Sequence, residues 1–244
     1  MATPIGNLED ITLRAINVLK TVDLIAAEDT RHTLKLLNHL EIKKPLISYY
    51  KQNEKTKTKE LIDKLINGEN IALVSDAGTP VISDPGEEIV KEAIEQKIDI
   101  VPIPGACALV NSIIASGLNA KEFIFAGFLP ANKKEKKEKL EEYKNIKQTL
   151  IFYEAPHKLI DTLQNMQDIL GDRNICLARE LTKIHEEFMR KPISKILEEY
   201  TEPRGEFVIV VEGSPKNADE KAQELMNALT LEEHMQFYLD KRNG

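Results

Sequence analysis

Hydrophobic positions in the first half of the chain alternate between helical spacing and short continuous runs. Apolar side chains recur every three to four residues in four stretches, over residues 11–22, 36–40, 61–66 and 89–94. A short apolar run follows each stretch, at residues 24–27, 46–50, 71–74 and 98–101. Strands that alternate with helices predict βαβ units and a mostly parallel sheet.

The second half has strands at a different spacing. Apolar runs predict strands at residues 123–128, 150–153, 175–178 and 207–211, and helical spacing predicts a helix over 156–170. Residues 180–190 lack a helical stripe and are open to interpretation as a further strand. An uncharged helix around residues 108–115 lies between the halves, so we place a boundary near Gly117. We therefore predict two α/β domains, residues 1–117 and 118–215.

Both ends of the sequence suggest that it is a trimmed form of a longer chain. The turn at residues 3–6 would ordinarily follow a strand, and only two residues precede it. We expect residues 216–244 to form a helical tail that begins a longer carboxyl-terminal segment.

Composition narrows the class of protein. A chain of 244 residues can bury one or two cores without crosslinks, and its two cysteines, Cys107 and Cys176, are too few for a disulfide framework or a metal site. We therefore expect a reducing, cytoplasmic location. The 21 uncharged residues 100–120 are long enough to span a membrane, but their prolines and glycines favour strand, turn and buried helix. No signal peptide or membrane span is predicted.

The net charge of −7 is the wrong sign for a protein that coats nucleic acid. Residues 1–60 are nevertheless slightly basic, with ten Lys and Arg against eight Asp and Glu. Any contact with nucleic acid should therefore be local. The sequence contains no glycine-rich dinucleotide motif, P-loop, nucleophile elbow or zinc-protease motif.

The most informative feature is the loop SDAGTPVISDPG at residues 75–86, directly after an apolar run. Ligands of open α/β sheets bind beyond the carboxyl ends of strands. Ala77 and Gly78 allow a ligand to approach the backbone, and Asp76 and Asp84 offer acceptors. An ordinary turn is the alternative, but twelve small, polar and proline residues exceed what a turn needs.

Other loops and clusters at strand ends are weaker signals individually. Gly105 and Ala106 precede a helix amino terminus, where free N–H groups point outward, and Asn7 would serve equally as a helix cap. The cluster Glu28–His32 has as its alternative a helix start capped by Asp29 or Thr30. Further polar clusters occupy residues 153–158, where His157 reads as an ordinary surface histidine, and 179–183.

Taken together these loops resemble the ribosomal small-subunit methyltransferase I family of the tetrapyrrole-methylase superfamily. The resemblance covers residues 2 to about 213 and rests on TPIGNL, AEDTR, SDAGTPxISDPG, PIPGA, GFLP, YEAPHKL, ARELTK and GEFVIVVEG. It implies two α/β domains of the tetrapyrrole-methylase type, with S-adenosylmethionine in the cleft between them, and a homodimer. The implied reaction is methyl transfer to the ribose 2′-oxygen of a cytidine in the decoding region of 16S rRNA, within the small ribosomal subunit.

The resemblance also implies cofactor contacts, which lie in the loops of both domains. They are Pro4, Asp76, Ala77, Gly78, Val81, Ile82, Ser83, Gly105, Ala106, Tyr153, Glu154, Ala155, Ala178, Gly205 and Glu206. The family usually has a fuller first strand and a small basic carboxyl-terminal segment, both short or missing here.

A ribose hydroxyl is a poor nucleophile, so a carboxylate within reach of its proton would help. Glu28, Asp29, Glu154 and Glu180 are candidates, with Arg31 and Lys183 to orient the substrate. We favour Glu28, Asp29 and Arg31 as the catalytic, substrate-side cluster.

For contact with RNA we consider a group of lysines, Lys51, Lys55, Lys57 and Lys59, ahead of the helix predicted at residues 61–66. Lysines at a helix start oppose its dipole, which suggests a phosphate partner, although a flexible surface loop is equally consistent. Tyr49 or Tyr50 would stack on an unpaired base, or both are strand core. The lysine-rich residues 133–144 read as a solvated helix face, with an RNA-facing helix as the alternative.

Two other functions stay open. A small-molecule methyltransferase acting on a tetrapyrrole would suit the acidic surface. A non-catalytic ribosome-assembly factor would keep the cofactor loops without turnover.

Overall fold

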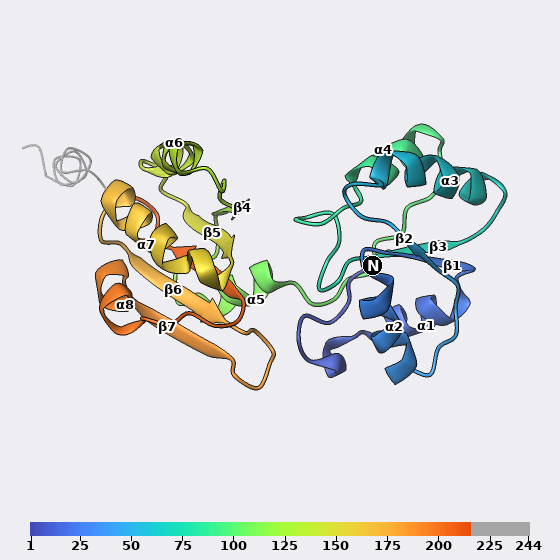
Figure 1. Cartoon of the computed structure of the whole chain (residues 1–244), viewed down its shortest axis with the longest axis horizontal. Helices are drawn as coiled ribbons and strands as arrows, with labels where there is room; N and C mark the ends of the chain where they lie inside the picture. Colours follow the sequence, from blue (N-terminus) through green and yellow to red (C-terminus); the bar gives the residue numbers. More distant parts are fainter. Residues whose placement is uncertain (216–244) are drawn as a thin grey trace, which may run out of the picture.

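The computed structural model describes residues 1–215, which form two β-sheets with helices on their faces (Figure 1). The first sheet has the order β2-β1-β3, from Leu46–Ser48, Leu24–Ala27 and Ile71–Val74, and both pairings are parallel. The sequence therefore predicted the parallel arrangement correctly for this half.

Four helices cover both faces of the first sheet. Ile25 and Ala27 of β1 pack against α1 (Leu13–Thr21) and α2 (Thr30–His39). Leu24 and Ala26 point to the opposite face, toward α3 (Glu54–Ile66) and α4 (Glu87–Glu95). Successive residues of a strand alternate between faces, so all four residues of β1 are buried.

The second sheet has the order β4-β5-β8-β6-β7 and is mixed. Only β4 (Phe123–Phe128) and β5 (Thr149–Glu154) pair in parallel. Their neighbours β8 (Phe207–Val211), β6 (Asn174–Arg179) and β7 (Glu187–Pro192) pair antiparallel. A mostly parallel arrangement thus holds for the first sheet alone.

Helices also cover both faces of the second sheet. The larger core lies under α6 (Lys133–Tyr143), α7 (Pro156–Leu170) and α8 (Ile193–Glu199). On the opposite face, Leu109 and Ile113 of α5 (Ala108–Ser116) pack against Ile151, Cys176 and Val210. The division at Gly117 stays a prediction, and the packing of α5 favours a division ahead of Ala108.

Two predicted strands differ from the structure. Residues 98–101 form no strand, because a cavity of about 800 Å³ separates this segment from β3, and Val101 is 68% exposed. Of residues 180–190 only those from Glu187 onward join β7, since Glu180 and Thr182 take left-handed backbone angles that end a strand.

The expected helical tail over residues 216–244 lies outside the described residues. Within residues 1–215 every helix is too short or too polar to cross a membrane.

Candidate functional site

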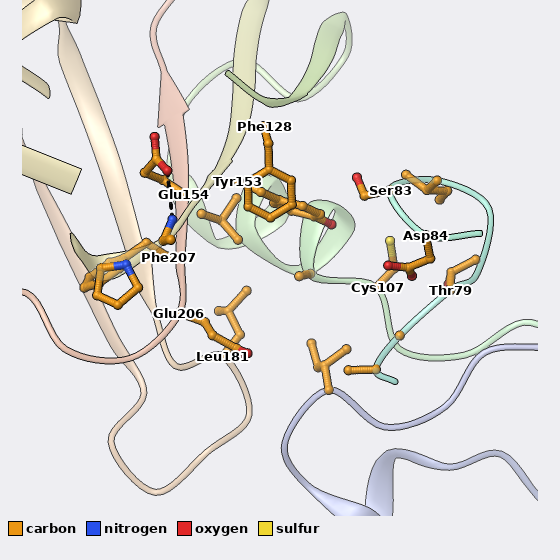
Figure 2. A pocket seen from close by; sticks show the side chains of 18 residues that line it. Thr79, Ser83, Asp84, Cys107, Phe128, Tyr153, Glu154, Leu181, Glu206 and Phe207 are labelled. Atoms are coloured by element: carbon orange, nitrogen blue, oxygen red, sulfur yellow. Dashed lines mark hydrogen bonds between the residues drawn. The ribbon is translucent and has the colours of Figure 1, made fainter. Parts of the chain in front are cut away.

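A cavity of about 380 Å³ opens between the two halves, at loops that follow strands of both sheets (Figure 2). One wall comes from the loop after β3 and the other from the ends of β4, β5 and β8 and the loop after β6. This position matches the carboxyl-end rule that the sequence analysis applied to residues 75–86.

The first wall is made from three loops that are tied together. Gly78 and Thr3 exchange backbone hydrogen bonds of 3.1 and 2.8 Å, and the hydroxyl of Thr79 donates to the carbonyl of Ala106 at 3.2 Å. Gly78 has a φ of 78°, and an added Cβ would lie 3.1 Å from Ile5 Cγ2. Glycine is therefore required there both by the backbone angle and by the close approach of the first loop.

The second wall is aromatic. Tyr153 meets Phe125 and Phe128 edge-on, with ring centroids 4.9 and 5.6 Å apart. Its hydroxyl accepts a hydrogen bond from the N–H of Leu109 at 3.0 Å. Burial raises the pKa of Tyr153 to about 12, so the phenol stays neutral at physiological pH.

Glu154, beside this aromatic wall, is a buried carboxylate with a complete set of partners. One oxygen accepts from the N–H of Ala155 at 2.9 Å, drawn as the dashed line in Figure 2, and the other from the hydroxyl of Thr162 at 2.6 Å. The ammonium group of Lys136 in turn donates to Thr162 at 3.1 Å and to Asp161 at 2.9 Å. Lys136 is therefore buried, which makes the prediction of a wholly solvated face for residues 133–144 wrong at this position.

Three carboxylates lie near one another at the loop after β3. The N–H of Asp76 donates to Glu28 at 3.3 Å, while Asp84 lies in the cavity wall. Burial raises the pKa of Glu28, and the negative charges of Asp84 and Asp76 raise it further. Burial and the charge of Asp76 likewise raise the pKa of Asp84. The loop thus places a carboxyl that resists ionisation against the cavity.

Glu28, Asp29 and Arg31 lie next to Asp76 but do not line the cavity. Asp29 caps α2 by accepting from the N–H of Arg31 at 2.8 Å, so the alternative of a capped helix start is confirmed. The Arg31 guanidinium, 88% exposed, pairs with Asp29 at 2.7 Å and holds the pKa of that carboxyl far below its usual range. The catalytic role of these three residues stays a prediction.

The structure brings about half of the predicted cofactor residues to the cavity. Those that line it are Ala77, Gly78, Ile82, Ser83, Tyr153, Glu154, Ala155 and Glu206. The others, Pro4, Asp76, Val81, Gly105, Ala106, Ala178 and Gly205, do not.

The residues away from the cavity have identifiable packing roles. Ala178 belongs to the core beneath α5, and Val81 lines the larger cavity instead. An added Cβ on Gly105 would lie 2.9 Å from Ala2, and one on Gly205 would lie 2.5 Å from the Glu180 side chain. These two glycines allow close packing of loops.

Ten residues of the wall are absent from the cofactor contacts that the resemblance implied. They are Ile5, Thr79, Asp84, Cys107, Ala108, Phe128, Pro156, Leu181, Phe207 and Val208. Asp84 alone among them was expected from the loop at residues 75–86, as an acceptor for a ligand. Most are immediate neighbours of predicted contacts, so the signal was present in the same loops. Phe128 lies in the GFLP motif at the end of β4, which was quoted without a role.

The lysine cluster differs from its prediction. Helix α3 begins at Glu54, so Lys55, Lys57 and Lys59 lie within it and not ahead of it. The prediction erred because the helical pattern of α3 is masked by polar residues over its first two turns. Tyr49 is fully buried and its hydroxyl bonds to Thr58 at 2.9 Å, which confirms the core alternative for this residue.

The cavity fits S-adenosylmethionine in shape and chemistry. Ile5, Ile82 and Leu181 offer apolar faces to a flat ring, and Asp84 and Glu206 offer carboxylates to hydroxyl or cationic groups. The hydroxyl of Thr3, paired with Gly78 through the backbone, is the single buried side-chain polar atom in residues 1–215 without a hydrogen-bond partner. Thr3 does not line the cavity itself, so its buried hydroxyl lies in the tight junction between the first loop and Gly78.

Comparison with known proteins gives consistent results. The family model described as Tetrapyrrole (Corrin/Porphyrin) Methylases matches residues 2–197. Proteins named ribosomal RNA small subunit methyltransferase I, from Halalkalibacterium halodurans and from Bacillus subtilis, are each 51% identical over 98% of this chain, covering 83% and 82% of their own lengths.

Solved structures show the same fold at low identity. Diphthine synthase superposes with a TM-score of 0.67 at 12% identity, covering 91% of each chain. A cobalt precorrin-4 methyltransferase superposes with a TM-score of 0.63 at 15% identity, covering 87% of this chain and 92% of its own. The chain therefore belongs to the tetrapyrrole methylases, which are methyltransferases that use S-adenosylmethionine, and within them to the ribosomal RNA small subunit methyltransferase I family.

Proposed function

We propose that this chain transfers a methyl group to the ribose 2′-oxygen of a cytidine in the decoding region of 16S rRNA. The observation that carries the proposal is the 51% identity, over nearly the whole chain, to proteins named ribosomal RNA small subunit methyltransferase I. The cavity between the two sheets supports it, because it has room for the cofactor beside apolar and carboxylate side chains.

When bound, S-adenosylmethionine supplies an activated methyl group on a positively charged sulfur. Ala77 and Gly78 let it approach the backbone of the first loop, and Ile82 and Leu181 enclose its apolar parts. Tyr153 and Glu154 are held by Leu109 and Thr162, so this wall is rigid before binding. A rigid site favours transfer because the attacking oxygen must lie in line with the bond that breaks.

On the substrate side we retain Glu28, Asp29 and Arg31 as the proposed catalytic cluster. The exposed guanidinium of Arg31 is suited to a phosphate or a ribose oxygen. The raised pKa of Glu28 suits a group that accepts a proton, because it makes this carboxylate a stronger base than an ordinary one.

A homodimer in the cytoplasm, acting within the small ribosomal subunit, completes the proposal. The outer face of α5 supports a second copy, since Val110 and Ile114 stand exposed one turn apart, and Phe123 is exposed on the edge strand β4. Exposed apolar groups of this size favour a protein partner.

The experiment is incubation of the protein with tritiated S-adenosylmethionine and 30S subunits that lack the modification, or naked 16S rRNA. Label in an alkali-resistant dinucleotide would support ribose methylation, because a 2′-O-methyl group blocks alkaline cleavage. Label in a tetrapyrrole but not in RNA would favour the small-molecule alternative. Binding of cofactor and RNA without label would favour an assembly factor.

A further inference from the structure

The last residue of β4 presents an aromatic ring at the mouth of the cavity. Phe128 lines the cavity wall, yet 59% of it is exposed to solvent. Its ring makes an angle of 67° with that of Tyr153, so Tyr153 does not cover both of its faces. Figure 2 shows Phe128 beside Tyr153, with Ser83 and Asp84 across the cavity. An exposed aromatic face at the mouth of a ligand site is available for a base to stack on.

Helix α6 begins five residues after Phe128. The charges of its first turn are unfavourable for an isolated helix. Lys133 and Lys134 occupy its first two positions, where positive charge opposes the helix dipole. Lys133 and Lys137 lie one turn apart on the same side and repel one another. Neither makes an ion pair within 4.0 Å in residues 1–215, whereas Lys136 and Lys139 do. The hydrogen bond from Lys136 lowers the pKa of Asp161, and the nearby charge of Lys133 lowers it further. An anion between Lys133 and Lys137 would relieve this repulsion.

The opposite side of the cavity mouth is also basic. The side chain of Glu54, at the start of α3, accepts from the N–H of Gly86 at 2.8 Å and so ties α3 to the loop that holds Asp84. Lys51 and Lys55 flank Glu54 and are exposed. In Figure 1 both α3 and α6 lie along the upper edge of the molecule, one in each half. Exposed lysines thus stand on both sides of the opening.

We propose that Phe128 is a stacking platform for the base of the nucleotide to be methylated, and that Lys133 and Lys137 bind the adjacent phosphates. This inference rests on the proposed function and specifies its RNA-binding site. Sequence-specific proteins hold single-stranded RNA by stacking its unpaired bases on aromatic side chains and by binding its phosphates with cations. Five residues of chain separate Phe128 from Lys133, at most about 18 Å, so one short stretch of RNA reaches both.

The test uses the full chain with S-adenosylmethionine and naked 16S rRNA or a fragment that wild type methylates. Phe128→Leu keeps the apolar volume and removes the aromatic face, and Phe128→Tyr restores that face. Lys133→Glu/Lys137→Glu reverses the charge on α6. Lys20→Glu/Lys195→Glu applies the same charge change to exposed lysines of α1 and α8, which lie along the lower edge in Figure 1. Calorimetry measures cofactor affinity, and filter binding measures RNA affinity at several salt concentrations.

We expect Phe128→Leu to weaken RNA binding by roughly 5- to 100-fold, the range for loss of one stacked base, and to weaken it by a larger factor than cofactor binding, since Phe128 also lines the cofactor cavity. Phe128→Tyr should bind RNA as wild type does. Lys133→Glu/Lys137→Glu should lower the slope of log affinity against log salt by about 2, one for each phosphate contact. The control pair should leave that slope unchanged.

Two results would overturn the inference. If the wild-type protein methylates the RNA and Phe128→Leu binds that RNA with unchanged affinity, stacking on Phe128 is excluded. An equal loss in Lys20→Glu/Lys195→Glu would show that only overall charge matters. Absence of RNA label from the wild-type protein is a separate outcome, and it would refute the proposed function itself.

Discussion

The hydroxyl of Thr162 donates a 2.6 Å hydrogen bond to the buried carboxylate of Glu154, from the first turns of α7 to the last residue of β5. Thr162 also accepts from Lys136 of α6, so two helices that cover the second sheet jointly fix one residue of the cavity wall. The cofactor site is therefore held in place partly by the packing of α6, which does not line the cavity, against α7, which reaches the cavity only through Pro156.

Replacement of Thr162 by valine tests this connection. Valine keeps the shape but leaves an oxygen of Glu154 without its donor, which should lower the free energy of unfolding by about 1–3 kcal/mol and weaken cofactor binding. Urea unfolding and calorimetry measure the two effects. Thr162→Ser retains the hydroxyl and should recover both. Wild-type cofactor affinity in Thr162→Val would show that the position of Glu154 does not affect cofactor binding.

Gly78→Ala should damage the site more than an equivalent change elsewhere. Gly78 and Gly68 both have positive φ, but an added Cβ meets Ile5 at 3.1 Å only at Gly78, while nothing lies within 4 Å at Gly68. Both alanine variants should lose roughly 1 kcal/mol of stability from backbone strain. Only Gly78→Ala should also weaken cofactor binding, as measured by calorimetry. Equal cofactor affinity in the two variants would mean that the loop contact has no part in binding.

The raised pKa of Asp84 makes a prediction about pH. A carboxyl whose pKa is higher in the folded than in the unfolded state favours the fold while it is protonated. Its stabilising contribution to the free energy of unfolding is therefore lost as pH rises through the folded-state pKa. Asp84→Asn should therefore be more stable than wild type at pH 7. The difference should shrink as pH falls toward the ordinary value of 3.8. Urea unfolding from pH 4 to pH 8 measures it, and a variant less stable than wild type at pH 7 would contradict the assigned burial.

Asp29 has two separable roles, as a cap of α2 and as a proposed member of the substrate-side cluster. Asp29→Ala removes both and should cost about 1 kcal/mol of stability. Asp29→Asn keeps a capping side chain and removes only the charge that holds Arg31. We expect Asp29→Asn to lower turnover while the free energy of unfolding and the cofactor affinity stay at their wild-type values. Wild-type turnover in Asp29→Asn would show that Asp29 acts only as a helix cap.

Part of the first half was readable from sequence because β1 is buried on both faces. β1 has no polar residue, so its bounds at Leu24 and Ala27 follow directly from the apolar run. The pairing of strands is harder to predict. Residues 98–101 are also mainly apolar, apart from Asp99, but they have no adjacent ladder partner, which only the folded chain reveals.

The sequence predicted which loops form the site but not which of their side chains line the cavity, and the reason is physical. Small residues mark where a ligand approaches the backbone, but they do not show which neighbouring side chain turns inward. Ile5 lines the cavity while Pro4 is buried beside it, and Asp84 lines it while the Asp76 carboxylate accepts from the N–H of Asp29 at 2.9 Å. The sequence also did not show which side of α6 packs against the protein. Lys136 and Lys137 are adjacent and identical, yet Lys136 is buried and Lys137 is exposed.

The position of the methyl group in RNA tests the central claim most directly. Unmodified 30S subunits would be treated with the protein and S-adenosylmethionine, and nuclease fragments of their 16S rRNA would be sequenced by mass spectrometry. We predict one added methyl group, on the ribose of a single cytidine in the decoding region. A methyl group on a base, on another region of the RNA, or on no nucleotide despite bound cofactor would contradict the account.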